Sequence, residues 1–78
     1  MTFYQFINLN KDDQALIVWE HGVYISSRED LEYKYLHYRI NTFYVQVWYH
    51  REHNIILRFK AFISVEQLKM ALSNVSLN

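Results

Sequence analysis

The hydrophobic pattern of this chain changes its period once, and that change is the strongest constraint on its fold. From Val23 to Ile63 large apolar residues recur at every second position, in segments rich in β-branched and aromatic residues. This is the spacing of a strand whose side chains alternate between two faces. It predicts four strands, over residues 23–28, 33–40, 42–50 and 54–63.

Helical signals precede this stretch. Thr2 predicts a cap for a short helical turn over residues 3–8, and Asn10 predicts the start of a second helix over residues 11–21. Gly22 then stands where a left-handed residue would end that helix. The stripe of the second helix that we expect to face the core is Ala15, Leu16 and Trp19.

A third helix is predicted after the strands. Ser64 with Gln67 matches a capping box, and the apolar residues that follow fall on one helical face: Val65, Leu68, Ala71 and Leu72. At 78 residues the chain has the size of one domain, residues 1–78. The expected fold class is α+β, a four-stranded antiparallel meander with N- and C-terminal helices packed on one face.

Face parity sets the register expected for the two later hairpins. A two-residue turn at residues 41–42 aligns the second and third strands with apolar residues opposite apolar ones. A three-residue loop at residues 51–53 does the same for the third and fourth strands, with Asn54 in the left-handed conformation. On the polar face this register predicts the pairs Tyr35 with Trp48, His37 with Gln46, Gln46 with Arg58, and Tyr44 with Lys60.

The predicted meander has two chemically different faces. The face expected beneath the helices carries Val23, Ile25, Leu36, Tyr38, Ile40, Phe43, Val45, Val47, Tyr49, Ile55, Leu57 and Phe59. The other, open face carries Tyr24, Tyr33, Tyr35, His37, Arg39, Tyr44, Gln46, Trp48, His50, Ile56, Arg58, Lys60 and Phe62. No acidic residue is expected on this open face, although the chain as a whole has formal net charge zero.

An open face rich in Tyr, Trp and Arg is typical of protein contacts. It predicts a non-enzymatic interaction module that binds a second copy of the chain or another protein. The residues expected to bind are Tyr35, His37, Arg39, Tyr44, Trp48, Arg58 and Lys60.

Two other interpretations of this face stay open. Cross-strand aromatic and Arg–aromatic pairs also stabilise a sheet that only faces solvent. Alternatively, Tyr35, Tyr44 and Trp48 would stack the bases of a single-stranded nucleic acid, with Arg and Lys on its phosphates. A chain without net charge has no bulk field that attracts polyanions, and these strands lack the RNA-recognition consensus.

Catalytic and metal-binding patterns are weak. Cysteine is absent, so no thiolate nucleophile or cysteine metal site is available. His50, Glu52 and His53 are close in sequence, but no third histidine is near, and we expect ordinary hairpin residues. Ser26 and His37 have no acid to orient them. We therefore expect no catalytic residue, metal or cofactor.

The N-terminus lacks a basic segment followed by a long apolar one, so no signal peptide is predicted. No apolar run approaches the roughly 20 residues of a spanning helix. We expect no membrane association and a cytoplasmic location.

Three short motifs resemble those of a group of short, uncharacterised bacterial proteins. These are FYVQVWY over residues 43–49 with Asn54 in the following turn, FISVEQL over residues 62–68, and W-x-x-G from Trp19 to Gly22. In that group an FYVxVxY strand and an F-x-S-x-x-Q-L helix start recur. The resemblance implies a single domain and carries no known activity.

Overall fold

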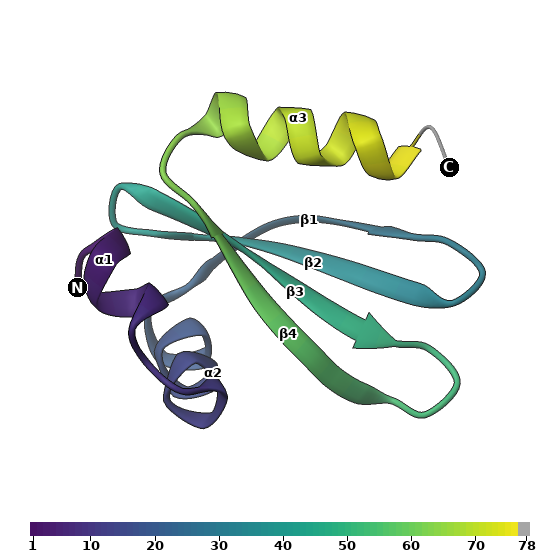
Figure 1. The fold of residues 1–78 in the computed structure, drawn as a ribbon, viewed down its shortest axis with the longest axis horizontal. Helices are drawn as coiled ribbons and strands as arrows, with labels where there is room; N and C mark the ends of the chain where they lie inside the picture. Colours follow the sequence, from purple (N-terminus) through teal and green to yellow (C-terminus); the bar gives the residue numbers. More distant parts are fainter. Residues whose placement is uncertain (77–78) are drawn as a thin grey trace.

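The computed structural model describes the backbone of residues 1–76 and the side chains of residues 1–71. The elements, in chain order, are α1 (Phe3–Ile7), α2 (Lys11–His21), β1 (Val23–Glu29), β2 (Tyr33–Ile40), β3 (Phe43–His50), β4 (Ile55–Phe62) and α3 (Val65–Ser76). The strands form one antiparallel sheet in the order β1-β2-β3-β4 (Figure 1). The α+β class, the meander and the terminal helices are confirmed.

Both predicted N-terminal caps are present. The Thr2 hydroxyl accepts a hydrogen bond from the Gln5 N–H at 3.1 Å, and the Gln5 side chain accepts one from the Thr2 N–H at 2.8 Å. Asn10 Oδ1 accepts from the Asp13 N–H at 2.9 Å, which starts α2. Side-chain oxygens thus satisfy backbone donors that a helix start leaves without a partner.

The predicted inward stripe of α2 is correct only in part, since Ala15 packs against the core and the Trp19 ring contacts Tyr38 and Phe59. Val18 is the buried residue of α2, whereas Leu16 and Trp19 are 55% and 49% exposed. The apolar residues of α2 are consecutive, from Ala15 to Trp19, and at 3.6 residues per turn they occupy the whole circumference of the helix. The pattern therefore could not indicate which side of α2 packs on the sheet.

Gly22 ends α2, but not in the left-handed conformation that we expected. Its φ is −74° and its ψ is 138°, an extended conformation open to any residue. A Cβ atom at this position would lie 2.5 Å from the Val18 carbonyl oxygen and 3.1 Å from Cδ1 of Tyr38. The glycine is needed because the chain approaches its neighbours closely there. Left-handed residues occur instead at Asn41 and, as predicted, at Asn54, with φ of 52° and 54°.

The predicted register of β2 with β3 is confirmed, including Tyr35 opposite Trp48 and His37 opposite Gln46. The predicted register of β3 with β4 is wrong by one residue next to the turn and by two residues farther along the strands. Four residues, not three, separate the paired His50 and Ile55, and a bulge then inserts Leu57.

The longer loop and the bulge each shift β4 by one residue relative to β3. Together they leave every residue after the bulge on its predicted face but opposite a different residue of β3. Arg58 therefore lies opposite Trp48, and Lys60 lies opposite Gln46.

Other face assignments also change. A bulge at Ile25 in β1 places Tyr24 opposite Tyr38 and Val23 opposite Arg39, so both are on the opposite face from the one predicted. In β4, Ile56 and Ile55 exchange faces for the same reason, because they precede the bulge. Bulges leave no periodic signal, since one inserted residue inverts the alternation locally.

The principal core lies between α1, α2 and one face of the sheet, here called the inner face. Its buried residues are Phe6, Val18, Ile40, Phe43, Val45, Val47 and Phe59. The other side of the sheet, the outer face, carries Val23, Ser26, Arg28, Tyr33, Tyr35, His37, Arg39, Tyr44, Gln46, Trp48, His50, Ile55, Arg58, Lys60 and Phe62.

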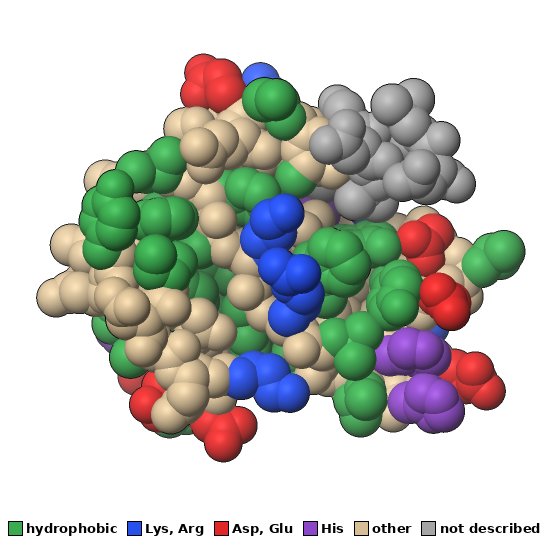
Figure 2. All heavy atoms as spheres, viewed as in Figure 1, with side chains coloured by type: hydrophobic (Ala, Val, Ile, Leu, Met, Phe, Trp, Pro, Cys, Tyr) green, Lys and Arg blue, Asp and Glu red, His purple; other side chains and the backbone are tan. Residues whose placement is uncertain are grey.

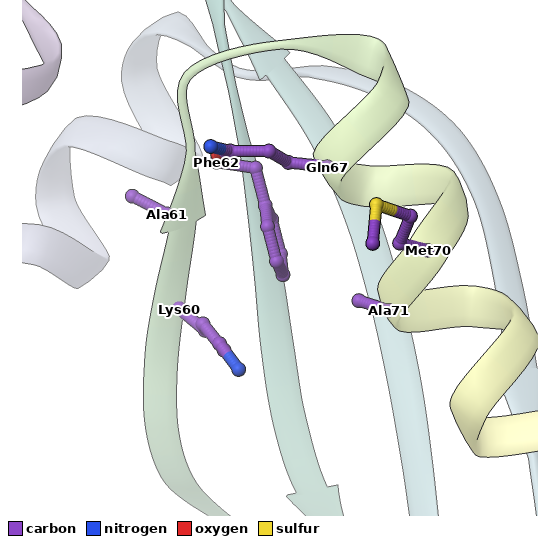
Figure 3. Close-up of a pocket in the computed structure, with 6 residues that line it drawn as sticks. All are labelled: Lys60, Ala61, Phe62, Gln67, Met70 and Ala71. Carbon is purple, nitrogen blue, oxygen red and sulfur yellow. The ribbon is translucent and has the colours of Figure 1, made fainter.

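Helix α3 lies on the outer face, so the prediction that all helices pack on one face is wrong. Figure 3 shows Lys60 and Phe62 pointing from β4 toward α3, while Ala61 points the other way. Phe62 and Leu68 are buried in this contact, at 5% and 4% exposure. The physical reason is the connection, because Ile63 and Ser64 are too few residues to carry the chain around the sheet edge.

The predicted start of α3 is confirmed, since the Ser64 hydroxyl accepts from the Gln67 N–H at 3.3 Å. Of its predicted apolar face, Leu68 is buried and Val65 is 38% exposed. Leu72 lies outside the described side chains.

Candidate functional site on the outer sheet face

Burial and position along the strands divide five of the predicted binding residues into three groups. His37 is fully buried, at 0% exposure, in the middle of the outer face. Arg39 and Tyr44 form a pair on one side of it, and Tyr35 and Trp48 form a pair on the other. The two pairs are four residues apart along each strand, or about 13 Å at 3.3 Å per residue. Arg39 and Tyr44 therefore do not belong to one continuous site with Trp48.

Tyr33, Tyr35 and Arg58 each contact the ring of Trp48, and we call these four residues the aromatic–cation cluster. The ring centroid of Trp48 lies 5.0 Å from that of Tyr35 and 5.9 Å from that of Tyr33, at interplanar angles of 85° and 59°. The guanidinium carbon of Arg58 lies 5.3 Å from the Trp48 ring centroid. This cation–π contact exists because the bulge at Leu57 brings Arg58 opposite Trp48.

The outer face carries positive charge without a compensating carboxylate. None of its residues is acidic, as the sequence predicted, and Arg58 and Lys60 are exposed. Among the described residues, the two ion pairs join His21 to Glu20 and Arg51 to Glu29, so neither engages this face. Figure 2 shows Lys and Arg side chains in the middle of the visible surface beside a hydrophobic group, with His, Asp and Glu at its edge.

The acidic groups at that edge belong to the hairpin turns. Asp30 stabilises the turn between β1 and β2 through its carboxylate. Its Oδ1 accepts from the N–H groups of Tyr33 and Glu32 at 2.7 and 2.9 Å, and its Oδ2 accepts from the Tyr35 hydroxyl at 3.0 Å. The Tyr33 N–H, more than the Glu32 N–H, lowers the pKa of Asp30 below 3.8. Burial, and then the bond to Asp30, raise the pKa of Tyr35 to about 12.

A partly buried chain of hydrogen bonds runs across the outer face and ends at the cluster. The Trp48 Nε1–H donates to Gln46 Oε1 at 2.9 Å. Gln46 Nε2 lies 3.1 Å from His37 Nε2, and His37 Nδ1 lies 3.2 Å from the Ser26 carbonyl oxygen and 3.3 Å from its hydroxyl.

Burial lowers the pKa of His37 from 6.5, and the Arg28 charge lowers it further, while the Ser26 carbonyl opposes them. The sequence predicted the pair of His37 with Gln46 but not its burial, because burial depends on what packs above the strands.

The described residues offer little catalytic or metal-binding chemistry. His37 uses its basic nitrogen on Gln46, so the proton-bearing nitrogen faces Ser26 and cannot activate that hydroxyl. His50 and His53 stack with centroids 4.6 Å apart. No group of three or more candidate metal ligands occurs within the described part of the chain.

The inner face is not completely covered by its helices, contrary to the expectation from the sequence. A hollow of about 330 Å³ on this face is lined by Trp19, Lys34, Leu36, Tyr49 and Asn54. A second hollow, of about 340 Å³, lies between β4 and α3 beside Lys60 and Phe62 (Figure 3).

Comparison with protein-family models, with curated proteins and with solved structures gave no match. The resemblance to short bacterial proteins therefore stays a prediction. Within the described residues no helix has the length and apolar character needed to cross a membrane. The geometry of the outer face is thus the basis on which a function is argued.

Proposed function

We propose that this protein is a non-enzymatic interaction module, which binds another protein molecule through Tyr33, Trp48, Arg58 and Lys60, with the buried Tyr35 supporting the Trp48 ring. A second copy of the same chain is its simplest partner. The observation that carries the proposal is the exposed Arg58 stacked on Trp48, on a face whose strand residues include no acidic one.

Two properties of the cluster support a protein contact. Tyr, Trp and Arg are the residue types most enriched among those that dominate binding energy at interfaces. The rings of Tyr33, Tyr35 and Trp48 also hold one another at steep angles, so little side-chain freedom remains to be lost on binding.

The distribution of charge favours a second copy as the partner. Arg58 and Lys60 lie on the strands, whereas Glu32 and Glu52 lie in the hairpin turns next to the cluster. Two copies that pack outer face to outer face with antiparallel strands would each bring acidic turns toward the other's cations. A two-fold contact of this kind is self-complementary. A chain with formal net charge zero also lacks long-range repulsion between copies.

Single-stranded nucleic acid is the second candidate, favoured by the cations on a face without carboxylates. The stacking platform expected from the sequence is less suited to it. Tyr35 is 4% exposed and packs edge-to-face on Trp48, and Arg58 occupies the Trp48 ring. Tyr44 lies on the far side of His37. Bases would therefore have to displace Arg58 before they could stack.

Charge reversal with rescue tests the leading proposal. Arg58→Glu with Lys60→Glu in one variant, and Glu32→Arg with Glu52→Arg in another, should each weaken self-association. An equimolar mixture should restore it, because each interface then joins opposite charges again. Sedimentation equilibrium across concentration measures all three samples, and Lys34→Glu, on the inner face, is the matched control that should behave as wild type.

Wild-type protein that remains monomeric at several hundred micromolar would refute self-association. Titration with a single-stranded oligonucleotide at two salt concentrations, followed by Trp fluorescence, then addresses the second candidate. Contacts from about three cations predict a log–log salt slope near −2, at roughly −0.7 per contact. Absence of quenching at low salt would exclude nucleic-acid binding by this face.

A further inference from the structure

The chain Ser26–His37–Gln46–Trp48 assigns one proton position without ambiguity. An indole N–H can only donate, so the Gln46 atom that meets it must be the oxygen. Gln46 Nε2 therefore faces His37 Nε2 and must donate to it. His37 Nε2 carries no proton, and its Nδ1–H donates to the Ser26 carbonyl. The buried chain is thus complete only with neutral His37.

We propose that this chain makes the interaction surface pH-sensitive: protonation of His37 reverses the Gln46 amide and removes the acceptor that holds the Trp48 indole. The inference rests on the proposed function, since it concerns the regulation of the same surface. A protonated His37 would place its Nε2–H against the Gln46 amide N–H, and two donors cannot bond. Rotation of the amide by about 180° relieves this conflict, and the amide then turns its nitrogen toward the Trp48 N–H, which is also a donor.

The consequence reaches the surface because Trp48 is the centre of the cluster. Tyr33, Tyr35 and Arg58 all pack against its ring. Loss of the hydrogen bond from Trp48 Nε1 to Gln46 lets the indole ring leave the position in which these three residues contact it. Acid should therefore weaken binding of the partner without any change in the charge of the partner-binding cations.

The surroundings of His37 make the neutral form the resting state. From β1 it is faced by Ser26 and Arg28, from β3 by Gln46, and from β4 by Lys60 across Gln46. On β2 itself the neighbours on the same face are Tyr35 and Arg39, and the charged residues described on α3, Glu66 and Lys69, are exposed. No carboxylate among the described residues contacts the imidazole, and the Ser26 carbonyl, which favours the cation, is outweighed by burial and the Arg28 charge.

Nuclear magnetic resonance of the wild-type protein tests the switch without a partner. Long-range ¹H–¹⁵N spectra at pH 7.5 should show His37 protonated at Nδ1. On acidification the Trp48 indole N–H signal should shift together with the His37 ring, with a midpoint below 6.5. A Trp19→Phe variant assigns the indole signal. An Nε2–H tautomer at pH 7.5, or a Trp48 signal that ignores the His37 titration, would overturn the proposal.

Variants separate His37 from the other histidines near the surface. His37→Gln retains an acceptor for Gln46 and a donor for Ser26 but does not titrate, so the Trp48 transition should disappear. The control His50→Gln with His53→Gln should retain it. If the transition of the Trp48 signal disappears in the control variant instead, His50 or His53 at the β3–β4 turn is the sensor and the proposal is wrong.

Self-association gives the functional readout. In the His50→Gln, His53→Gln background, the dissociation constant should rise roughly fivefold from pH 7.5 to pH 5.5, about the value of one hydrogen bond. The same change should be absent once His37→Gln is added, and a dissociation constant that still rises would contradict the switch. If the protein does not self-associate at all, the proposed function fails, while the spectra still decide whether His37 controls Trp48.

Discussion

Replacement of Gly22 by Ala has two opposite effects on the free energy of unfolding, and the structure indicates which is larger. The extended φ and ψ of Gly22 suit alanine, so reduced freedom of the unfolded chain should stabilise the protein by about 0.4–1 kcal/mol. The new Cβ, however, would lie 2.5 Å from the Val18 carbonyl oxygen, closer than real Cβ contacts, and 3.1 Å from Tyr38. Overpacking of this kind costs about 1–3 kcal/mol.

The net expectation is a loss of about 1–2 kcal/mol in the free energy of unfolding, by difference of these two effects. The obstacle is a backbone oxygen in the last turn of α2, which also accepts a hydrogen bond from the Gly22 N–H at 2.8 Å, so this turn must open to admit the Cβ. Urea unfolding followed by circular dichroism measures the loss. For a chain of this size the slope is about 1 kcal/mol/M, so the midpoint should fall by roughly 1–2 M.

Gly22→Asn is the matched comparison. Asparagine tolerates the left-handed conformation better than alanine but adds the same Cβ. The close contact therefore predicts that Asn destabilises at least as much as Ala. A Gly22→Ala protein as stable as wild type, or an Asn variant clearly more stable than the Ala variant, would refute the argument from close approach.

Four further predictions concern the turns, the cluster and pH. Asn54→Ala should cost about 1 kcal/mol, because Asn54 has a φ of 54°, whereas Asn54→Gly should be nearly neutral; urea unfolding compares them. Asp30→Ala should destabilise the β1–β2 hairpin more than Asp30→Asn, since the amide oxygen can still accept from the Tyr33 and Glu32 N–H groups; amide hydrogen exchange in residues 29–34 detects the difference. Trp48→Ala should remove self-association and, because Trp48 is half-buried, should also lower stability by about 2 kcal/mol; equal association by the variant would contradict its role. Burial lowers the pKa of His37 from 6.5, so below that pH the unfolded chain binds more protons than the folded one. This part of the stability is therefore complete above pH 6.5 and is lost as the pH falls toward the folded-state pKa. The difference in free energy of unfolding between pH 7.5 and pH 5 should be smaller in His37→Gln than in the wild type.

Features that depend on neighbouring residues in the chain could be predicted from the sequence. Thr2, Asn10 and Ser64 cap helices because their side chains bond to N–H groups three residues ahead. The register of β2 with β3 also followed from the sequence, since a two-residue turn leaves one alignment that keeps apolar residues together. The absence of acidic residues on the outer face was predicted as well, and it survived the exchange of Tyr24 and Ile56 to the inner face.

The tertiary structure decided which of these residues share a surface. The bulges at Ile25 and Leu57 have no local signal, yet the second one brings Arg58 to Trp48. The position of α3 depends on the inner face being occupied by α1 and α2 and on the shortness of its connection to β4. His37 and Gln46 are fully buried on this face, and no pattern within a single strand could have indicated it, because burial depends on what packs above a residue.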